Sequence, residues 1–506
     1  MQLRIYNTLT RQKEDFAPNE PGKASVYVCG ITPYDYSHCG HARVYVVFDV
    51  VCRALVRLGY DVKYVRNFTD VEDKIIRRAQ ENGEAFDALA ERFIAAYHDD
   101  MNRLGCNRPD VEPRVTTHMP EIMSMIEDII ARGHAYVVDG DPGSEIRSDS
   151  EKLQGRDVYF HVDSFSEYGL LSRRLHEDNA DGASERVLHD ARKKDQRDFA
   201  LWKAAKPGEP AWPSPWGQGR PGWHIECSAM ACKHLGTTFD LHGGGKDLVF
   251  PHHENEIAQA RAANGGAFSK GWMHVGFLTL DAEKMSKSTG NFFTIRDVLA
   301  RFHPQVLRYF LLTAHYLHPL NFSDKAMDEA NRRVLYVYEK LAAADALLAG
   351  RDVKAGLEPA QVTQARADLL DALCDDFHTP RALAGLSEIV QALGTAVEKP
   401  KVAGNVELAW HLRAFFREAA GLLGVFDQDA TAMVEVIVES ARDRLFPAGS
   451  ERLAWVETSI AQREAARAAK EWRQADELRD ALMGGGVELR DGREGTTWRP
   501  QLAMIP

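Results

Sequence analysis

The feature that most constrains the fold lies near the start of the sequence, where a short β-rich run precedes a long amphipathic one. Residues 24–29 read ASVYVC, and residues 41–60 have helical periodicity and end beside Gly59, a residue suited to a helix C-terminus. Residues 61–70, DVKYVRNFTD, have the pattern of a second strand. A strand, a helix and a strand in this order form a βαβ unit, so the sequence predicts an α/β fold with a parallel sheet.

A second group of predicted strands lies in the middle of the chain. Residues 237–245, TTFDLHGGG, and residues 275–280, VGFLTL, are strand-like, and a short helix is predicted between them over 251–263. We expect these elements to form the second half of the same parallel sheet.

Most of the remaining sequence has a helical pattern. Residues 71–132 are predicted to be helical, with breaks at Gly83 and around 109–113. From residue 326 to the low 440s the chain reads as long Ala- and Leu-rich helices, and a further helix is expected over 459–486. The last residues resemble a small strand pair.

Two polar stretches interrupt this pattern. Residues 139–157 are predicted to form a surface insertion. Residues 173–198 are highly charged, and a solvated helix or loop explains them better than a binding patch does.

Charge and composition limit the possible partners and location. The formal net charge of −12 gives no global attraction for nucleic acid or an anionic membrane, so a nucleic-acid partner must be held by a local surface. The apolar segment 44–58 is too short and too charged to span a bilayer. The first residues lack the apolar core of a signal peptide, and the seven cysteines are scattered, so we expect reduced thiols in the cytoplasm.

The stretch SHCGHAR (37–43) has the features of a phosphate-binding helix start. Ser37 can cap a helix, and His38 and His41 are three residues apart, so they share one face. Free N–H groups at a helix N-terminus suit phosphate, the imidazoles could donate to a triphosphate, and Gly40 would let a flat base approach the backbone. An ordinary helix start with two surface histidines explains the stretch about equally well.

The stretch EKMSKS (283–288) is a second candidate phosphate site. Lys284 and Lys287 are three residues apart in a polar loop that could clamp pyrophosphate and stabilise negative charge in a transition state. Such a lysine pair alone is usually a solvated turn. Its significance comes from following the histidine pair within the same predicted fold.

Cysteine, histidine and carboxylate residues make up a third constellation. Cys29 ends the first predicted strand, Cys227 lies in GWHIECSAM, and His252 and Glu256 are four residues apart, so they share one face of a helix. Two thiolates, an imidazole and a carboxylate are a suitable tetrahedral set for zinc.

Two alternatives to this ligand set remain open from the residues alone. His253 with Glu256 would fit nearly as well as His252, and Pro251 is expected at the first position of the helix that carries them. Buried cysteines beside a polar helix start would need no metal at all.

The HCGH and KMSKS stretches together resemble the two signatures of class I aminoacyl-tRNA synthetases, the first of which is usually written HIGH. Cys39 occupies a slot that normally holds an apolar residue, and free cysteine packs like a small hydrophobe. With the third constellation, the chain resembles cysteinyl-tRNA synthetases from RIYNTLTR at 4–11, through VRNFTDVEDKII at 65–76, to GTTW at 495–498.

This resemblance implies a Rossmann-like parallel-sheet catalytic domain with insertions, then a helical (DALR-like) domain and a small C-terminal α+β domain that binds the anticodon. The expected boundaries are 1–138 and 222–325 for the two halves of the catalytic domain, 139–221 for the connective insertion, 326–445 for the helical domain and 446–506 for the anticodon-binding domain.

The resemblance also implies one Zn²⁺ per chain, held by Cys29, Cys227, His252 and Glu256. Zinc is thiophilic, so it would distinguish cysteine from serine without an editing domain. ATP would enter as a substrate with Mg²⁺. The implied ATP-binding residues are His38, Gly40, His41, Lys284 and Lys287, of which all but Gly40 are also the implied catalytic residues.

Other positions match residues of the cysteine pocket in this family. Thr32 and Trp223 match the pocket walls, His224 its floor, and Asp247, in HGGGKD, the carboxylate that holds the substrate ammonium. From the residues alone, HGGGKD would be a flexible loop and His224 a structural histidine.

Trp472 and Asp476, in EWRQAD, match positions that read the anticodon, although a buried tryptophan on an amphipathic helix explains them as well. The implied activity joins L-cysteine, ATP and tRNA(Cys), in a chain expected to be a monomer. One alternative is a ligase that transfers activated cysteine to an amino sugar, but the stretches at 459–498 argue against it. A non-catalytic, zinc-stabilised RNA-binding paralogue would not need both intact motifs.

Overall fold

A computed structural model gives the fold and describes residues 2–139, 145–147, 152–173, 191–280, 283–284, 293–353, 356–492 and 495–501. The chain forms two compact units. The N-terminal unit contains Met1–Phe277, Tyr316–Pro319 and Leu373–Phe377, and the C-terminal unit contains Leu278–His315, Leu320–Ala372 and His378–Pro506.

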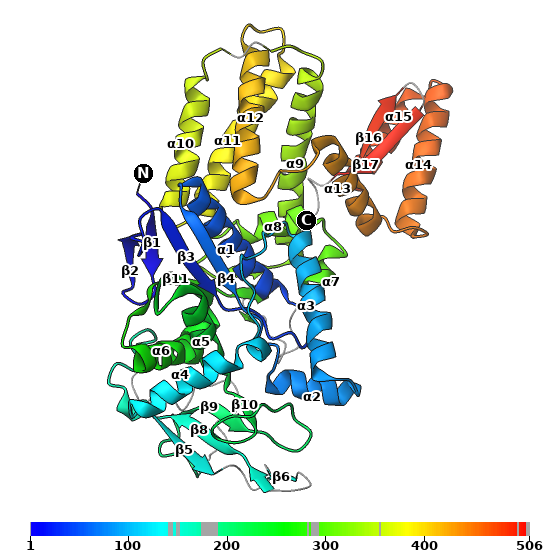
Figure 1. The fold of residues 1–506 in the computed structure, drawn as a ribbon. Helices are drawn as coiled ribbons and strands as arrows, with labels where there is room; N and C mark the ends of the chain where they lie inside the picture. Colours follow the sequence, from blue (N-terminus) through cyan, green and yellow to red (C-terminus); the bar gives the residue numbers. More distant parts are fainter. Residues whose placement is uncertain are drawn as a thin grey trace. The chain divides into compact units, whose positions relative to one another are not determined.

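A four-stranded parallel sheet forms the centre of the N-terminal unit, with strand order β12-β11-β3-β4. Three of its strands, β11, β3 and β4, are labelled in Figure 1. Its strands are β3 (Lys23–Val28), β4 (Asp61–Arg66), β11 (Thr238–Gly245) and β12 (Phe268–Val275). The helix α1 (Cys39–Arg57) connects β3 to β4. The βαβ unit and the parallel sheet predicted from the sequence are therefore confirmed.

The strand predicted over 275–280 was expected in the central sheet, and this prediction is wrong. The neighbour of β11 is β12, which reads FSKGWMHV, whereas Leu278–Leu280 forms β13 in the C-terminal unit. There β13 pairs with β15 (Leu320–Phe322) and β14 (Glu283–Lys284). The polar start of β12 breaks the continuous apolar pattern expected of a central strand, which explains the error.

The N-terminus of α1 differs from the predicted one. His38, and not Ser37, is the N-cap, because its Nδ1 accepts a hydrogen bond from the His41 N–H. The helix ends at Arg57, and Gly59 has a φ of 91°, which is the left-handed conformation expected of a glycine just past a helix end.

α1 packs closely on the sheet through Phe48, which is fully buried. A Cβ added to Gly243 of β11 would lie 2.0 Å from the Phe48 Cζ, so this position has no room for a side chain.

We expect Gly243→Ala to destabilise the protein by about 1–3 kcal/mol, because the Phe48 ring or the strand must shift to admit the methyl group. Urea unfolding measures the change. Gly421→Ala on α12 (Asn405–Leu423) is a matched control, because a Cβ there meets nothing within 4 Å. Alanine is favoured over glycine in a helix by about 1 kcal/mol, so the control should be stabilised. Equal unfolding midpoints for the two variants would contradict this account.

Five more helices and an antiparallel sheet complete most of the N-terminal unit. The helices are α2 (Asp73–Asn82), α3 (Phe86–Arg103), α4 (Met119–Ala131), α5 (Trp223–Leu235) and α6 (Glu254–Asn264). Gly83 ends α2 in the left-handed conformation, and residues 109–113 separate α3 from α4, so both predicted breaks are confirmed.

The antiparallel sheet has the order β10-β9-β8-β5 and contains β5 (Ala135–Asp139), β8 (Arg156–Phe160), β9 (Phe199–Ala204) and β10 (Gly219–Pro221). Two hairpins are formed by β1 (Arg4–Asn7) with β2 (Gln12–Asp15) and by β6 (Glu145–Arg147) with β7 (Lys152–Gln154).

The two polar stretches lie within this antiparallel sheet region and are described in part. Residues 140–144, 148–151 and 174–190 lie outside the described residues. After them, Arg192 forms an ion pair of 2.7 Å with Asp157, and the Lys194 ammonium lies 4.5 Å from the centre of the Tyr136 ring. These contacts give the described basic residues a structural role on the sheet.

The C-terminal unit contains the long helices expected from residue 326 onwards. Its helices are α7 (Ile295–Leu299), α8 (Pro304–Leu311), α9 (Asp324–Leu348), most of α10 (Ala360–Cys374), α11 (Thr379–Glu398), α12, α13 (Ala430–Leu445), α14 (Glu451–Ala468) and α15 (Trp472–Gly484). The chain then forms an antiparallel pair, β16 (Val487–Gly492) with β17 (Gly495–Pro500), as predicted. Among the described residues, none of the helices combines the length and apolarity needed to cross a lipid bilayer.

The single helix predicted over 459–486 is wrong, because the chain forms two helices there. α14 ends at Ala468, α15 begins at Trp472, and Lys470 between them has a φ of 61°. Glycine or asparagine usually marks such a left-handed helix end, and lysine gives no such signal in the sequence.

Candidate active site

The four residues of the predicted zinc set lie together inside the N-terminal unit. Cys29 directly follows β3, Cys227 is on α5, His252 lies in a π-helical turn ahead of α6, and Glu256 is in the first turn of α6. All four are buried, and their ligand atoms lie within 4.8 Å of one another.

The distances within this group suit a tetrahedral zinc ion. The Cys29 and Cys227 sulfur atoms are 3.7 Å apart, which is close to the roughly 3.8 Å expected for two thiolates on one zinc with bonds of about 2.3 Å. The Glu256 Oε1 lies 3.4 Å from the Cys29 Sγ and 3.0 Å from the His252 Nε2. A zinc ion would need little movement of these side chains.

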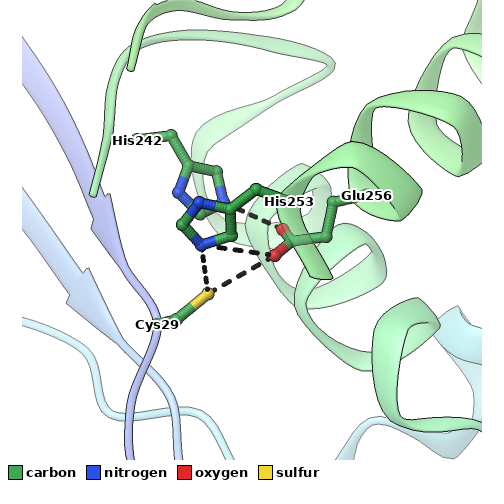
Figure 2. A group of neighbouring side chains, drawn as sticks. All are labelled: Cys29, His242, His253 and Glu256. Atoms are coloured by element: carbon green, nitrogen blue, oxygen red, sulfur yellow. Dashed lines mark hydrogen bonds and ion pairs between the residues drawn. The ribbon is translucent and has the colours of Figure 1, made fainter. Parts of the chain in front are cut away.

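A second group shares Cys29 and Glu256 with the first and adds His242 and His253 (Figure 2). The His253 Nε2 lies 3.3 Å from the Cys29 Sγ and 3.8 Å from the Glu256 Oε1. His253 and Glu256, the alternative pair considered in the sequence analysis, therefore both lie close to the Cys29 sulfur. The first group offers two thiolates and the second only one, so the first suits a thiophilic metal better.

Two histidines hold ligands of the first group by hydrogen bonds. The His242 Nε2 lies 2.8 Å from the Glu256 Oε2, and the His224 Nδ1 lies 2.9 Å from the His252 Nδ1. Partners of this kind commonly orient metal ligands in proteins. His224 was expected at the pocket floor, whereas the contact of His242 with Glu256 was missed.

A chain of hydrogen bonds leads outward from Cys29 and was also missed. The His253 Nδ1 lies 2.8 Å from the His274 Nε2, and the His274 Nδ1 lies 2.8 Å from the Thr8 Oγ1. His274 pairs with Gly244 in the parallel register of β11 and β12, two residues beyond His242. Side chains at every second position of adjacent strands face the same side, so His242 and His274 share one face, which becomes visible only once β12 is known to be the neighbour of β11.

Burial and charge strongly shift the pKa values in this group. Burial disfavours charge on both His252 and Glu256. The Glu256 carboxylate nevertheless raises the pKa of His252 to about 10. His242 and then His252 hold the pKa of Glu256 well below its usual range. The hydrogen bond from the Cys29 thiol, with His252 nearby, lowers the pKa of Cys227 to about 6. Burial raises the pKa of the Cys29 thiol. The group therefore favours the anionic forms of Cys227 and Glu256 that a metal requires, whereas His252 and Cys29 must each release a proton to bind one.

Of the predicted pocket residues, Trp223 and His224 lie beside the group of Cys29, Cys227, His252 and Glu256. The Trp223 ring centre is 4.4 Å from that of His252, and 39% of the Trp223 surface is exposed. Thr32 is half-buried in the loop after β3, and Asp247 is exposed in the turn after β11. Because β3 and β11 are neighbouring parallel strands, both loops leave the same edge of the sheet, where open α/β sheets bind ligands.

The strand predicted over 237–245 is confirmed as β11, which contains His242, Gly243, Gly244 and Gly245, so the alternative of a flexible loop does not hold for this part of HGGGKD. The predicted place of Pro251 is wrong. Pro251 lies within the turn Val249–His253 and not at the first position of α6, because the preceding Phe250 is extended, as residues before proline tend to be.

The histidines of HCGH stack on each other at the start of α1. Their ring centres are 3.8 Å apart with an angle of 15° between the planes. Since the His38 Nδ1 accepts a hydrogen bond from the His41 backbone, the proton of a neutral His38 must be on Nε2. A Cβ at Gly40 would lie 2.8 Å from the His38 Nδ1, so a side chain at this position would force the His38 ring to move. Cys39 is fully buried, as expected of a packing residue.

A hydrogen bond connects this helix to Cys29, one of the four predicted zinc ligands. The Tyr45 hydroxyl of α1 donates to the Cys29 carbonyl oxygen over 3.3 Å. The KMSKS stretch is described only at its start, where the backbone of Lys284 pairs with Thr279 in the sheet of β13 and β14. Lys287 lies outside the described residues.

The two predicted anticodon residues lie on α15 of the C-terminal unit. Trp472 is the first residue of the helix and is 60% exposed, so it is not the buried tryptophan that the pattern also allowed. Asp476 is one turn further along and forms an ion pair of 3.0 Å with Arg479.

Three regions of the chain match known protein families. Residues 15–332 match the catalytic domain of class I (C) tRNA synthetases, residues 370–427 match the DALR domain, and residues 455–499 match the cysteinyl-tRNA ligase anticodon binding domain.

Full-length relatives and a solved structure agree with these matches. A cysteine–tRNA ligase of Anaeromyxobacter dehalogenans is 51% identical, over 99% of this chain and all of that protein. One of Pelobacter propionicus is 48% identical, over 98% of this chain and 99% of that protein. Mycobacterium tuberculosis methionyl-tRNA synthetase bound by methionyl-adenylate has a TM-score of 0.58 at 19% identity, covering 84% of this chain and 96% of that one, and so shares the fold. The chain therefore belongs to the cysteine–tRNA ligase family of class I tRNA synthetases.

Proposed function

We infer that the protein is a cysteine–tRNA ligase that activates L-cysteine with ATP and transfers the cysteinyl group to the 3′ end of tRNA(Cys). The observation that carries this proposal is the buried group of Cys29, Cys227, His252 and Glu256, which α1 contacts through Tyr45. A thiol-binding half-site next to a phosphate-binding helix start is what joining cysteine to ATP requires.

We assign one Zn²⁺ per chain to these four residues, with His242 orienting Glu256 and His224 orienting His252. Zinc, when bound, supplies a thiophilic centre that prefers the substrate thiol over the serine hydroxyl. A site built around the distinguishing group can reject its analogue by on the order of 10⁴-fold or more, so cysteine selection needs no editing step.

In the activation step the chain mainly positions the substrates and stabilises charge. We assign Asp247 to the substrate ammonium, and Thr32 and Trp223 to the walls of the pocket. The Nε2–H of His38 would donate to the phosphates of ATP, together with His41 and the ammonium groups of Lys284 and Lys287. Mg²⁺ would accompany ATP, and Gly40 would allow the base to approach the backbone.

The tRNA would use the C-terminal part of the chain. We assign residues 1–138 and 222–325 to catalysis, 139–221 to the connective insertion, 326–445 to the helical domain and 446–506 to anticodon binding. The expected working form is a monomer in the cytoplasm.

Cysteine-dependent exchange of pyrophosphate into ATP, followed by transfer of cysteine to tRNA(Cys), tests this function. Exchange and charging are both expected. Exchange without charging would favour an amino-sugar ligase instead. RNA binding without exchange would identify a non-catalytic relative.

The exposed Trp472 gives a separate prediction for tRNA recognition. Trp472→Ala should weaken tRNA(Cys) binding by about 1–3 kcal/mol, because stacking on an unpaired base is lost, and it should leave pyrophosphate exchange unchanged. Trp410→Ala on α12 is the control, since Trp410 is also surface-exposed, at 38%. Equal charging kinetics for the two variants would remove Trp472 from the tRNA-binding surface.

A further inference from the structure

Arg43 is a buried cation on α1, two residues beyond His41, and is only 1% exposed. Its Nη1 donates to the carbonyl oxygens of Gly276 (2.8 Å) and Phe277 (2.7 Å), and its Nη2 donates to that of His318 (2.6 Å). One guanidinium therefore holds the backbone of two segments that are distant in sequence.

These two segments also contact each other tightly. The Gly276 N–H donates to the Tyr316 carbonyl oxygen over 2.7 Å, and a Cβ on Gly276 would lie 2.6 Å from the His318 carbonyl oxygen. Only glycine fits this approach. The carbonyl groups are thereby brought close enough together for one side chain to bind all three.

Both segments are points at which the chain passes from the N-terminal to the C-terminal unit. Phe277 is followed directly by β13, whose Thr279 pairs with Lys284 in β14. Pro319 is followed directly by β15, which pairs in parallel with β13. Arg43 thus binds the last two residues of the N-terminal unit before β13 and the second-last residue before β15.

The chemistry of this contact depends on arginine. Burial lowers the pKa of Arg43 to about 10, so the group still carries its positive charge at neutral pH. The planar guanidinium presents several N–H donors in a fixed fork, whereas a lysine ammonium is a single compact centre on a flexible stem. Lysine would keep the charge but could not hold the three carbonyl groups in this arrangement.

We propose that Arg43 is a positioning residue for cysteine activation, which anchors the start of the HCGH helix to the backbone of Gly276, Phe277 and His318 within the N-terminal unit. This proposal rests on the function proposed above. Arg43 needs no contact with either substrate, because it acts through the backbone of Gly276, Phe277 and His318. A misplacement of about 1 Å can cost on the order of 100-fold in rate.

The test compares Arg43→Lys with Arg53→Lys. Arg53 is on the same helix and also donates to a carbonyl oxygen, that of Gly105, but it contacts neither crossing segment through that bond. We expect Arg43→Lys to lower kcat of pyrophosphate exchange by about 100-fold, with an unchanged dissociation constant for L-cysteine by calorimetry. Arg53→Lys should retain the wild-type rate.

Hydrogen exchange supplies a readout that does not depend on activity. The Gly276 amide should exchange faster in Arg43→Lys, while the Cys29 amide, which donates to the Gly243 carbonyl oxygen in the central sheet, should be unaffected. A wild-type exchange rate at Gly276, a wild-type kcat, or a parallel loss of cysteine affinity in Arg43→Lys would overturn the proposal. Absence of pyrophosphate exchange in the wild-type protein would instead reject the proposed function, and the Gly276 amide would still report on the anchoring role.

Discussion

Replacing Cys227 by alanine is expected to abolish stoichiometric zinc binding and, with it, cysteine activation. The Cys227 sulfur lies 3.7 Å from that of Cys29, and its pKa is lowered to about 6, so it supplies a thiolate at neutral pH. Without it, the group retains a single sulfur ligand and loses one of the two negative charges that stabilise His252, the other being that of Glu256. Zinc content after dialysis against a weak chelator, together with cysteine-dependent pyrophosphate exchange, measures both losses.

A variant that only disturbs the orientation of a ligand should be affected less. His242→Asn removes the hydrogen bond to the Glu256 Oε2 but keeps all four ligands, so zinc affinity should fall by roughly 10–100-fold and not be lost. Discrimination against serine should decrease with the zinc content. We expect this discrimination to be almost completely lost in Cys227→Ala and partly lost in His242→Asn. Full zinc content and intact rejection of serine in Cys227→Ala would show that the ligand assignment is wrong.

The second large effect is expected at His38, where the two ring nitrogens have different roles. Nδ1 caps α1 by accepting from the His41 N–H, so Nε2–H is the donor to substrate that we propose. His38→Asn keeps a side-chain oxygen for the cap, since asparagine is a favourable N-cap, but places no donor at the position of Nε2. Loss of one positioned donor in an active site costs about 10²–10³-fold in kcat, and we expect a loss of this size for His38→Asn.

His38→Gln is the complementary variant. Its amide nitrogen can reach the position of Nε2, so it should be more active in pyrophosphate exchange than His38→Asn, even though glutamine caps a helix less well. The thermal unfolding midpoint of each variant separates the capping effect from the catalytic one. Higher activity in the asparagine variant would mean that Nδ1, and not Nε2, donates to substrate.

The sequence predicted the parts of the fold that local patterns encode. The strands at 24–29 and 61–70 and the helix between them follow from periodicity and from Gly59, and the structure has all three. β12 was missed, because its first residues, Phe268 to Gly271, include two polar residues and a glycine and so lack the apolar run of an interior strand. The break at Lys470 was missed because a left-handed lysine has no local signature.

The candidate site also contains residues that the sequence identified and residues that it did not. Cys29, Cys227, His252 and Glu256 could be named from residue type and from family resemblance, and the structure brings them together. The contacts of His242 and His274 depend on how β11 lies against α6 and β12, and no spacing along the chain expresses that. Arg43 was passed over because its partners are backbone carbonyl oxygens, which carry no residue identity.

The strand order of the central sheet also has a consequence for biosynthesis. β11 lies between β3 and β12, yet 198 residues separate Cys29, which follows β3, from Cys227, which precedes β11. At about 5–20 residues per second, a ribosome needs roughly 10–40 s to add those residues. During that time β3 has only β4 beside it and presents an unpaired edge. The nascent chain thus exposes, for tens of seconds, the kind of apolar strand edge that molecular chaperones protect from aggregation.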